Sequence, residues 1–172
     1  GDAEAEATLV DLMHTHLEFI LPDGAVDNSW GTRNFKWTYW GTRTGDGLQL
    51  AYALLAEHDP RFATAALRNA ELLAQCTRNG TIDGGPHFGY QDEKPCIHHT
   101  FCHARALTAL LDYGVPDVPA TEPLPRATAD GVREFPELLT WLAARGPWRA
   151  TIRAYAWVYD TVRLPAGHAS GG

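Results

Sequence analysis

The chain has 172 residues, of which 45% are hydrophobic and 20% charged, values typical of a folded domain and not of a disordered segment. Fourteen basic residues against 21 acidic ones give a net charge of −7, which argues against nucleic acid or an anionic membrane as a partner. No apolar run approaches the ~20 residues that a membrane helix needs, and three cysteines cannot form a closed disulfide framework.

The first two thirds of the chain have the hydrophobic period of helices. Four helices are predicted, over residues 9–20, 46–59, 60–74 and 95–114. Asp46 is a residue type that caps helix starts, Pro60 suits a first helical turn, and Gly114 suits a helix end. Short apolar helices joined by long polar loops are typical of stacked helical hairpins.

The character of the sequence changes after Gly114. Four prolines fall within residues 116–125 and mark a linker. A short amphipathic helix is predicted over 135–142. From Trp148 onward apolar and polar residues alternate, which predicts a single strand whose partners lie elsewhere. We therefore expect a truncated β domain to begin at this strand.

Residues 27–43 concentrate aromatic and cationic side chains in a predicted loop. They include three of the six tryptophans and three cations, and no acid follows Asp27. Indoles stack on sugar rings, Arg pairs with carboxylates in a bidentate way, and Lys pairs with them as a point charge. We therefore predict a binding site for an anionic sugar; the alternative is that the aromatics are core and the cations only solvate the loop. The side chains concerned are Trp30, Arg33, Lys36, Trp40 and Arg43.

A second segment, residues 83–103, combines a glycine-rich loop with the start of the fourth predicted helix. The loop carries His87 and Tyr90, and His98 and His99 follow on the first turn of the helix. Histidine and tyrosine suit proton transfer at a carbon beside a carboxylate, and helix N-termini favour bound anions. Tyr90, His98 and His99 are therefore predicted catalytic residues, and His87 a substrate-binding one.

A zinc site competes with this interpretation. His99 and His103 are four residues apart on one predicted helical face, with Cys96 and Cys102 nearby. The spacing matches no closed Cys/His pattern, and cysteines are commonly small buried hydrophobes. We therefore expect no cofactor, with a divalent metal such as zinc as the alternative. His103 is expected to face the core, hydrogen-bonded and inert.

Three motifs follow one another towards the fourth helix: Asp83-Gly84-Gly85, Tyr90-Gln91-Asp92-Glu93 and Cys96-Ile97-His98-His99. Their order is similar to the Asp-Gly-Ser…Glu…Tyr-His stretch of heparinase II/III-like polysaccharide lyases. Asn28-Ser29-Trp30 resembles the upstream Asn-Asn-His motif of that family. The stretch from Trp148 to the glycine-rich end resembles the junction between the family's helical toroid and its β-sandwich. The resemblance covers most of residues 8–172.

The resemblance implies a mainly α fold in three parts. These are an arc of an (α/α) toroid over 1–114, a proline-rich linker with a short helix over 115–147, and the truncated start of a β-sandwich over 148–172. It also implies β-elimination on a uronic-acid-containing polysaccharide bound between toroid and sandwich. The implied partners are an acidic polysaccharide and the remainder of the β domain, in the periplasm or outside the cell.

Carried over by position, Asn28 neutralises the uronate carboxylate and His99 takes the place of the family's motif histidine. The family's tyrosine aligns with His98, so either His98 or Tyr90 is expected to remove the C5 proton. A glucuronidase-type hydrolase on the same toroid is one alternative, and a non-catalytic glycan-binding segment is another. The carboxylates available for hydrolysis are Asp27, Asp83, Asp92 and Glu93.

Overall fold

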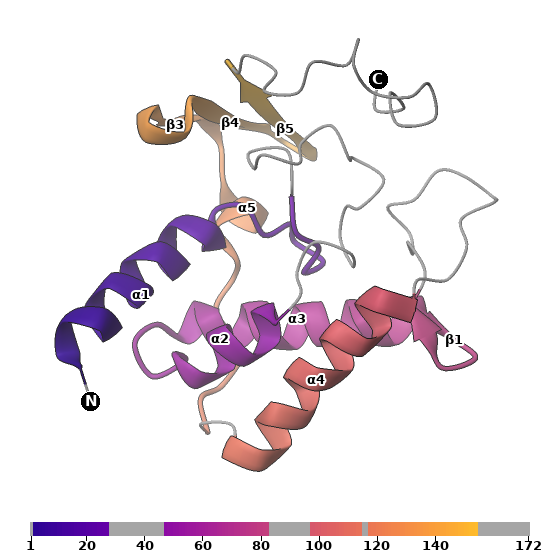
Figure 1. Ribbon diagram of the computed structural model, residues 1–172. Helices are drawn as coiled ribbons and strands as arrows, with labels where there is room; N and C mark the ends of the chain where they lie inside the picture. Colours follow the sequence, from indigo (N-terminus) through magenta and orange to yellow (C-terminus); the bar gives the residue numbers. More distant parts are fainter. Residues whose placement is uncertain (1, 28–46, 83–96, 115–116, 155–172) are drawn as a thin grey trace, which may run out of the picture.

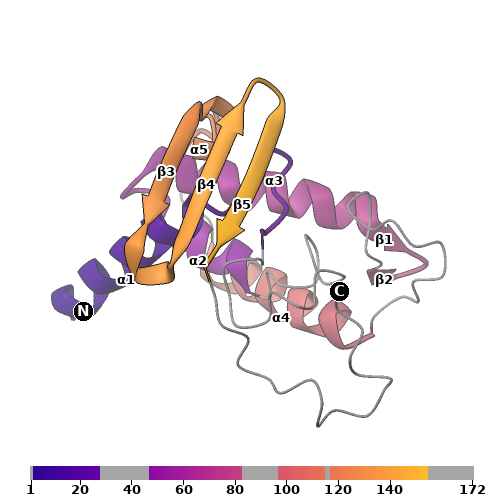
Figure 2. The same cartoon turned by 90° about the horizontal axis from the view of Figure 1, so that it is seen from above.

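The computed structural model describes residues 2–27, 47–82, 97–114 and 117–154. The helices in these ranges are α1 (Ala3–Leu17), α2 (Leu48–Leu54), α3 (Pro60–Cys76), α4 (Ile97–Tyr113) and α5 (Pro125–Thr128). The strands are β1 (Thr77–Arg78), β2 (Thr81–Ile82), β3 (Gly131–Phe135), β4 (Thr140–Arg145) and β5 (Trp148–Arg153). Helices α1 to α4 lie together, and the β3–β4–β5 sheet lies on one side of them (Figures 1 and 2).

Helix α1 begins where a side chain satisfies the backbone donors of its first turn. Oδ1 of Asp2 accepts hydrogen bonds from the backbone N–H groups of Glu4 and Ala5, both at 3.1 Å. The predicted first helix is confirmed, but it starts before the first apolar residues because this cap and the alanines and glutamates that follow favour helix.

The chain turns back directly after α1 through a tight loop, which packs against α3. Ile20 and Val26 form an antiparallel bridge in this loop, and Gly24 adopts φ +91°. A Cβ atom at Gly24 would lie 2.4 Å from the backbone carbonyl carbon of Arg68. Glycine therefore allows both the left-handed conformation and the close approach of this turn to α3.

Helix α3 begins at Pro60 as predicted and ends at Cys76. Helix α2 is shorter than the predicted 46–59, since it covers only Leu48–Leu54. Its cap residue is Gly47, which has no side chain to accept a hydrogen bond, and not the predicted Asp46. Asp59 caps α3 by accepting a hydrogen bond from the backbone N–H of Arg61 at 2.8 Å, and Pro60 occupies the first turn. The main core packs α1, α2 and α3 together. Its central aromatic pair is Tyr52 and Phe62, whose ring centroids are 5.3 Å apart and which are both fully buried.

Helix α4 is the predicted fourth helix, and it ends at Tyr113, directly before Gly114, which adopts φ +77° as expected for a helix stop. The hairpin of β1 and β2 lies beside its N-terminal end. The backbone N–H of Ile82, at the end of β2, donates to Oγ1 of Thr100 on α4 at 2.9 Å. This bond fixes the first turn of α4 against the hairpin.

The β part of the chain begins earlier than predicted. Trp148 does open a strand, β5, but β5 pairs with β4, and β4 pairs with β3, in one antiparallel sheet. The prediction of an unpartnered strand is therefore wrong. The helix predicted over 135–142 is also wrong: a 3₁₀ turn (Pro136–Leu138) and the start of β4 occupy that stretch. A helix of two turns has little stability of its own, so cross-strand pairing prevails here.

One face of the three-stranded sheet packs on the helical part. The rings of Phe19 and Phe135 lie 5.2 Å apart, and Thr140 and Leu142 of β4 are buried on this side. Arg133 of β3 also forms an ion pair with Glu18 at the end of α1. The described residues thus combine helices with antiparallel sheets, and both the helical and the β part of the prediction are present.

Candidate functional site

The predicted catalytic histidines that the structure describes lie on the first turn of α4. His98 is exposed, and its Nε2 lies 3.7 Å from Sγ of Cys102 one turn later. His99 is buried, with 8% of its surface exposed. The two imidazole rings are 5.1 Å apart and nearly perpendicular, at 84°. The structure therefore brings the pair together, with one ring in solvent and the other turned inward.

His103 lies one turn after His99 in a buried chain of amide side chains. Nδ2 of Asn69 donates to the carbonyl oxygen of Gly24 at 2.7 Å, so its Oδ1 is left to accept from Nε2 of Gln49. The same Nε2 lies 3.3 Å from Nδ1 of His103, which makes Nδ1 the acceptor and places the ring proton on the other nitrogen. The prediction that His103 faces the core with a hydrogen bond is confirmed.

A buried ion pair connects α5 to the end of the turn after α1, and a hydroxyl of strand β5 bonds to both ions. Arg126 of α5 donates from Nη1 to Oδ2 of Asp27 at 2.6 Å and to Oγ1 of Thr151 at 3.2 Å. The hydroxyl of Thr151 donates to the same carboxylate oxygen. Only 4% of the Arg126 side chain and 3% of the Asp27 side chain are exposed. We call Asp27, Arg126 and Thr151 the Asp27 clasp.

The clasp bears on the hydrolase alternative, for which Asp27 was one of four candidate carboxylates. A general acid or base must reach the glycosidic oxygen or a water beside it. The Asp27 carboxylate is shielded from solvent and committed to Arg126 and Thr151. Its position therefore suits a structural contact and not hydrolysis.

A second histidine–tyrosine pair was not predicted. Nδ1 of His16 on α1 lies 2.9 Å from the hydroxyl of Tyr52 on α2. Burial lowers the pKa of His16 to about 4, and burial together with the charge of Glu18 raises the pKa of Tyr52. Tyr52 has no exposed surface, so this neutral pair connects two helices inside the core. No sequence signal pointed to it, because its members are 36 residues apart on two apolar helix faces.

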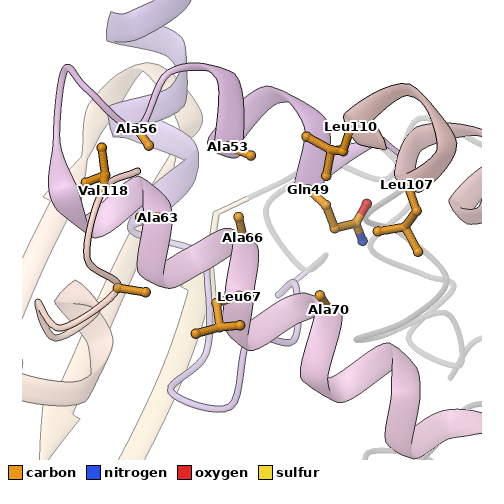
Figure 3. Close-up of a pocket in the computed structure, with 11 residues that line it drawn as sticks. Gln49, Ala53, Ala56, Ala63, Ala66, Leu67, Ala70, Leu107, Leu110 and Val118 are labelled. Atoms are coloured by element: carbon orange, nitrogen blue, oxygen red, sulfur yellow. The ribbon is translucent and has the colours of Figure 1, made fainter. Parts of the chain in front are cut away.

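An apolar pocket of about 320 Å³ lies between α2, α3 and α4 (Figure 3). Its lining is mostly alanine, with Leu67 and Leu110 on two sides and the amide of Gln49 among them. No charged side chain of the described part of the chain lines it, and neither His98 nor His99 does. The pocket therefore does not suit an acidic sugar.

The remaining predicted site residues lie outside the described ranges. They are Asn28, Trp30, Arg33, Lys36, Trp40, Arg43, His87 and Tyr90. Within the described ranges, no three His, Cys, Asp or Glu side chains gather closely enough to hold a metal ion. No helix in those ranges has both the length and the apolar character that crossing a bilayer requires.

The chain is similar to known proteins over most of its length. Residues 1–127 match the family model of the ulvan lyase N-terminal domain, and residues 132–172 match that of the ulvan lyase C-terminal domain. A broad-specificity ulvan lyase from Formosa agariphila is 53% identical over 145 residues, which make up 83% of this chain and 23% of that relative. The chain thus spans less than a quarter of the relative's length. No solved structure matches.

The two family models divide the chain where its structure changes. The first ends within α5 and the second begins in β3, so the Asp27 clasp holds residues from both matched regions. The first model alone covers well over half of the chain. The chain belongs to the ulvan lyase family.

Proposed function

We propose that the protein carrying this chain is a polysaccharide lyase that cleaves a uronic-acid-containing polysaccharide of the ulvan type by β-elimination. The observation that carries this proposal is the 53% identity to a protein described as a broad-specificity ulvan lyase. The clustering of His98 and His99 at the start of α4 supports it from the structure, because elimination needs groups that accept and donate protons.

The proposed reaction assigns each group one step. Asn28 and Arg33 bind the uronate carboxylate and offset the charge that develops when the C5 proton leaves. His98 or Tyr90 accepts that proton, the C4–O bond breaks as the C4–C5 double bond forms, and the leaving oxygen receives a proton with assistance from His99. The exposure of His98 fits the role of the base, since this ring is open to solvent.

Further parts of the proposal concern binding and surroundings. Trp30, Lys36, Trp40, Arg43 and His87 line the sugar subsites. A toroid akin to that of heparinase II/III-like lyases forms the helical part, and the β domain covers the cleft. The reaction uses no cofactor, because side chains carry out both proton transfers. The protein works in the periplasm or outside the cell, where a polymer too large to cross a membrane is found.

The chromophore of the product tests this function. Elimination leaves a double bond conjugated to the carboxylate, which absorbs at about 235 nm, whereas hydrolysis adds water and leaves no chromophore. The protein encoded by the whole reading frame should generate this absorbance from ulvan, and His98→Ala should lower the rate if His98 is the base. Reducing ends without absorbance would reassign the protein to the hydrolases. Binding without cleavage would leave a glycan-binding protein.

A further inference from the structure

The pocket between α2, α3 and α4 has one polar group in an apolar wall. Among the described residues that line it, Gln49 of α2 is the only polar one, and the others are alanine, leucine and valine (Figure 3). The pocket measures about 320 Å³. A dry cavity of roughly 150 Å³ holds benzene, and ligand sites begin near ~300 Å³. The space therefore suits a single ring that carries a short apolar extension.

Buried neighbours fix the orientation of the Gln49 amide. The carbonyl oxygen of Gly24 accepts from Nδ2 of Asn69, so Oδ1 of Asn69 faces Gln49 and accepts from its Nε2. Nδ1 of His103 lies 3.3 Å from the same Nε2 and takes its second hydrogen. Exchanging the nitrogen and oxygen of Gln49 would set acceptor against acceptor at both contacts. Oε1 is therefore the amide atom that this chain of hydrogen bonds does not use.

Oε1 of Gln49 is a buried acceptor, and no donor within the described part of the chain reaches it. Only 1% of the surface of Gln49 is exposed. Folded proteins rarely leave a buried carbonyl oxygen without a donor, because the oxygen has lost its hydrogen bonds to water. Figure 3 shows the amide extending from α2 towards Leu107, among the side chains that line the pocket. A donor inside the pocket is thus the partner that this oxygen requires.

We propose that the pocket binds a small neutral ligand with an apolar body and one hydroxyl group, which donates to Oε1 of Gln49. No charged side chain of the described residues lines the pocket, so an ammonium or a carboxylate would lose its water without gaining a counter-charge. A hydroxyl donates without carrying charge, and a simple phenol joins it to a ring of suitable size. The inference goes beyond the proposed function and does not rest on it.

Two isomeric probes test whether the hydroxyl is recognised by the protein encoded by the whole reading frame. Para-ethylphenol and para-methylanisole contain the same atoms, but the oxygen of the anisole carries a methyl group in place of the hydrogen. Isothermal titration calorimetry should give a Kd below about 1 mM for para-ethylphenol. Para-methylanisole should bind about fivefold more weakly or worse, because it leaves Oε1 of Gln49 without a donor.

Two alanine substitutions on α3 test where the phenol binds. Ala66→Leu extends a larger side chain from the wall of the pocket and should raise the Kd of para-ethylphenol about tenfold or more. Ala74→Leu is the matched control, because Ala74 is exposed on the same helix and does not line the pocket. Its Kd should stay within about twofold of the wild type. If Ala66→Leu does not fold, Leu67→Trp replaces it, since Leu67 lines the pocket and is 46% exposed.

Each result decides the inference. Tighter binding of the phenol than of the anisole, weakened by the pocket substitution and kept in Ala74→Leu, supports it. Equal affinity for the two isomers overturns it, because the pocket then recognises only the apolar body. Unchanged binding in the pocket variant, or equal weakening in Ala74→Leu, also overturns it, since the phenol then binds elsewhere. A wild type that binds neither isomer overturns it as well, and another part of the polypeptide then fills the pocket.

Discussion

Among the described residues, two ion pairs lie where the helical part of the molecule meets the β3–β4–β5 sheet, and they differ in nearly every physical respect. Arg126 and Asp27 are buried on both sides, with a hydroxyl sharing the carboxylate. Arg133 and Glu18 meet at the edge of the same interface, where 62% of the Arg133 side chain is exposed. Arg133 also lies 5.2 Å from the centre of the Phe135 ring, so its position does not depend on Glu18 alone.

The difference shows what burial does to a polar contact. In solvent, each ion of a broken pair is rehydrated, so the pair contributes little. In the interior, water does not replace a lost partner, and the remaining ion bears its full desolvation cost. The same reasoning extends to histidines: His16 is half-buried beside Tyr52, whereas His58 meets Glu6 at the surface, 2.9 Å away.

The largest effect is expected from breaking the buried pair on one side only. Arg126→Met leaves the Asp27 carboxylate buried without its partner cation, which should lower the free energy of unfolding by roughly 3–5 kcal/mol. Urea unfolding followed by tryptophan fluorescence measures this change. Adding Asp27→Leu should restore most of the loss. A double variant no more stable than the single one would contradict this account of the clasp.

An intermediate effect is expected from the half-buried His16. Desolvation lowers the pKa of His16 to about 4 in the folded protein, against an ordinary value of 6.5 for histidine, so the unfolded chain binds the proton more readily. Its contribution to stability is therefore complete above pH 6.5 and is lost as the pH falls towards 4, by up to about 3 kcal/mol.

Unfolding free energies at pH 7 and pH 4.5 measure this loss. The His16→Gln variant removes the titrating ring, so the difference between the two pH values should shrink in this variant. Equal pH dependence in the wild type and in His16→Gln would show that His16 is not the group responsible.

The smallest effect is expected at the exposed pair. Arg133→Met should lower the free energy of unfolding by less than about 1 kcal/mol, because solvent screens the exposed charge of Arg133, although only 12% of the Glu18 side chain is exposed. Raising the salt concentration to about 1 M should remove most of what remains. If Arg133→Met lowered the free energy of unfolding as much as Arg126→Met, burial would not explain the difference between the two ion pairs.

Local signals explain the parts of the fold that were predicted correctly. Pro60 and its cap Asp59 mark the start of α3, and Gly114 marks the end of α4, because each acts through backbone geometry within one turn. The stretch 135–142 was predicted as a helix because Phe135, Leu138 and Leu142 fit a helical period. Strand pairing with residues far along the chain decides that stretch, and no local pattern encodes it.

The candidate site divides in the same way. His98 and His99 were identified because a glycine-rich loop and a helix start lie next to them in the sequence, and the structure places their rings together. The Asp27 clasp was not predicted. In the sequence Asp27 is only an acidic residue at the start of a loop, and its partner Arg126 lies 99 residues further along the chain. The loop residues proposed to bind substrate, from Asn28 to Arg43, remain predictions.

The residues of the Asp27 clasp are synthesised at very different times. Asp27 and Thr151 are 124 residues apart, so the carboxylate leaves the ribosome long before the hydroxyl that will share it. At 5–20 residues per second this interval lasts about 6–25 s. Helices α1 to α4 are complete within it, while the Asp27 carboxylate still faces water. The nascent chain must therefore keep a charged group solvated at a place that later becomes interior, and it closes the interface only when β5 arrives.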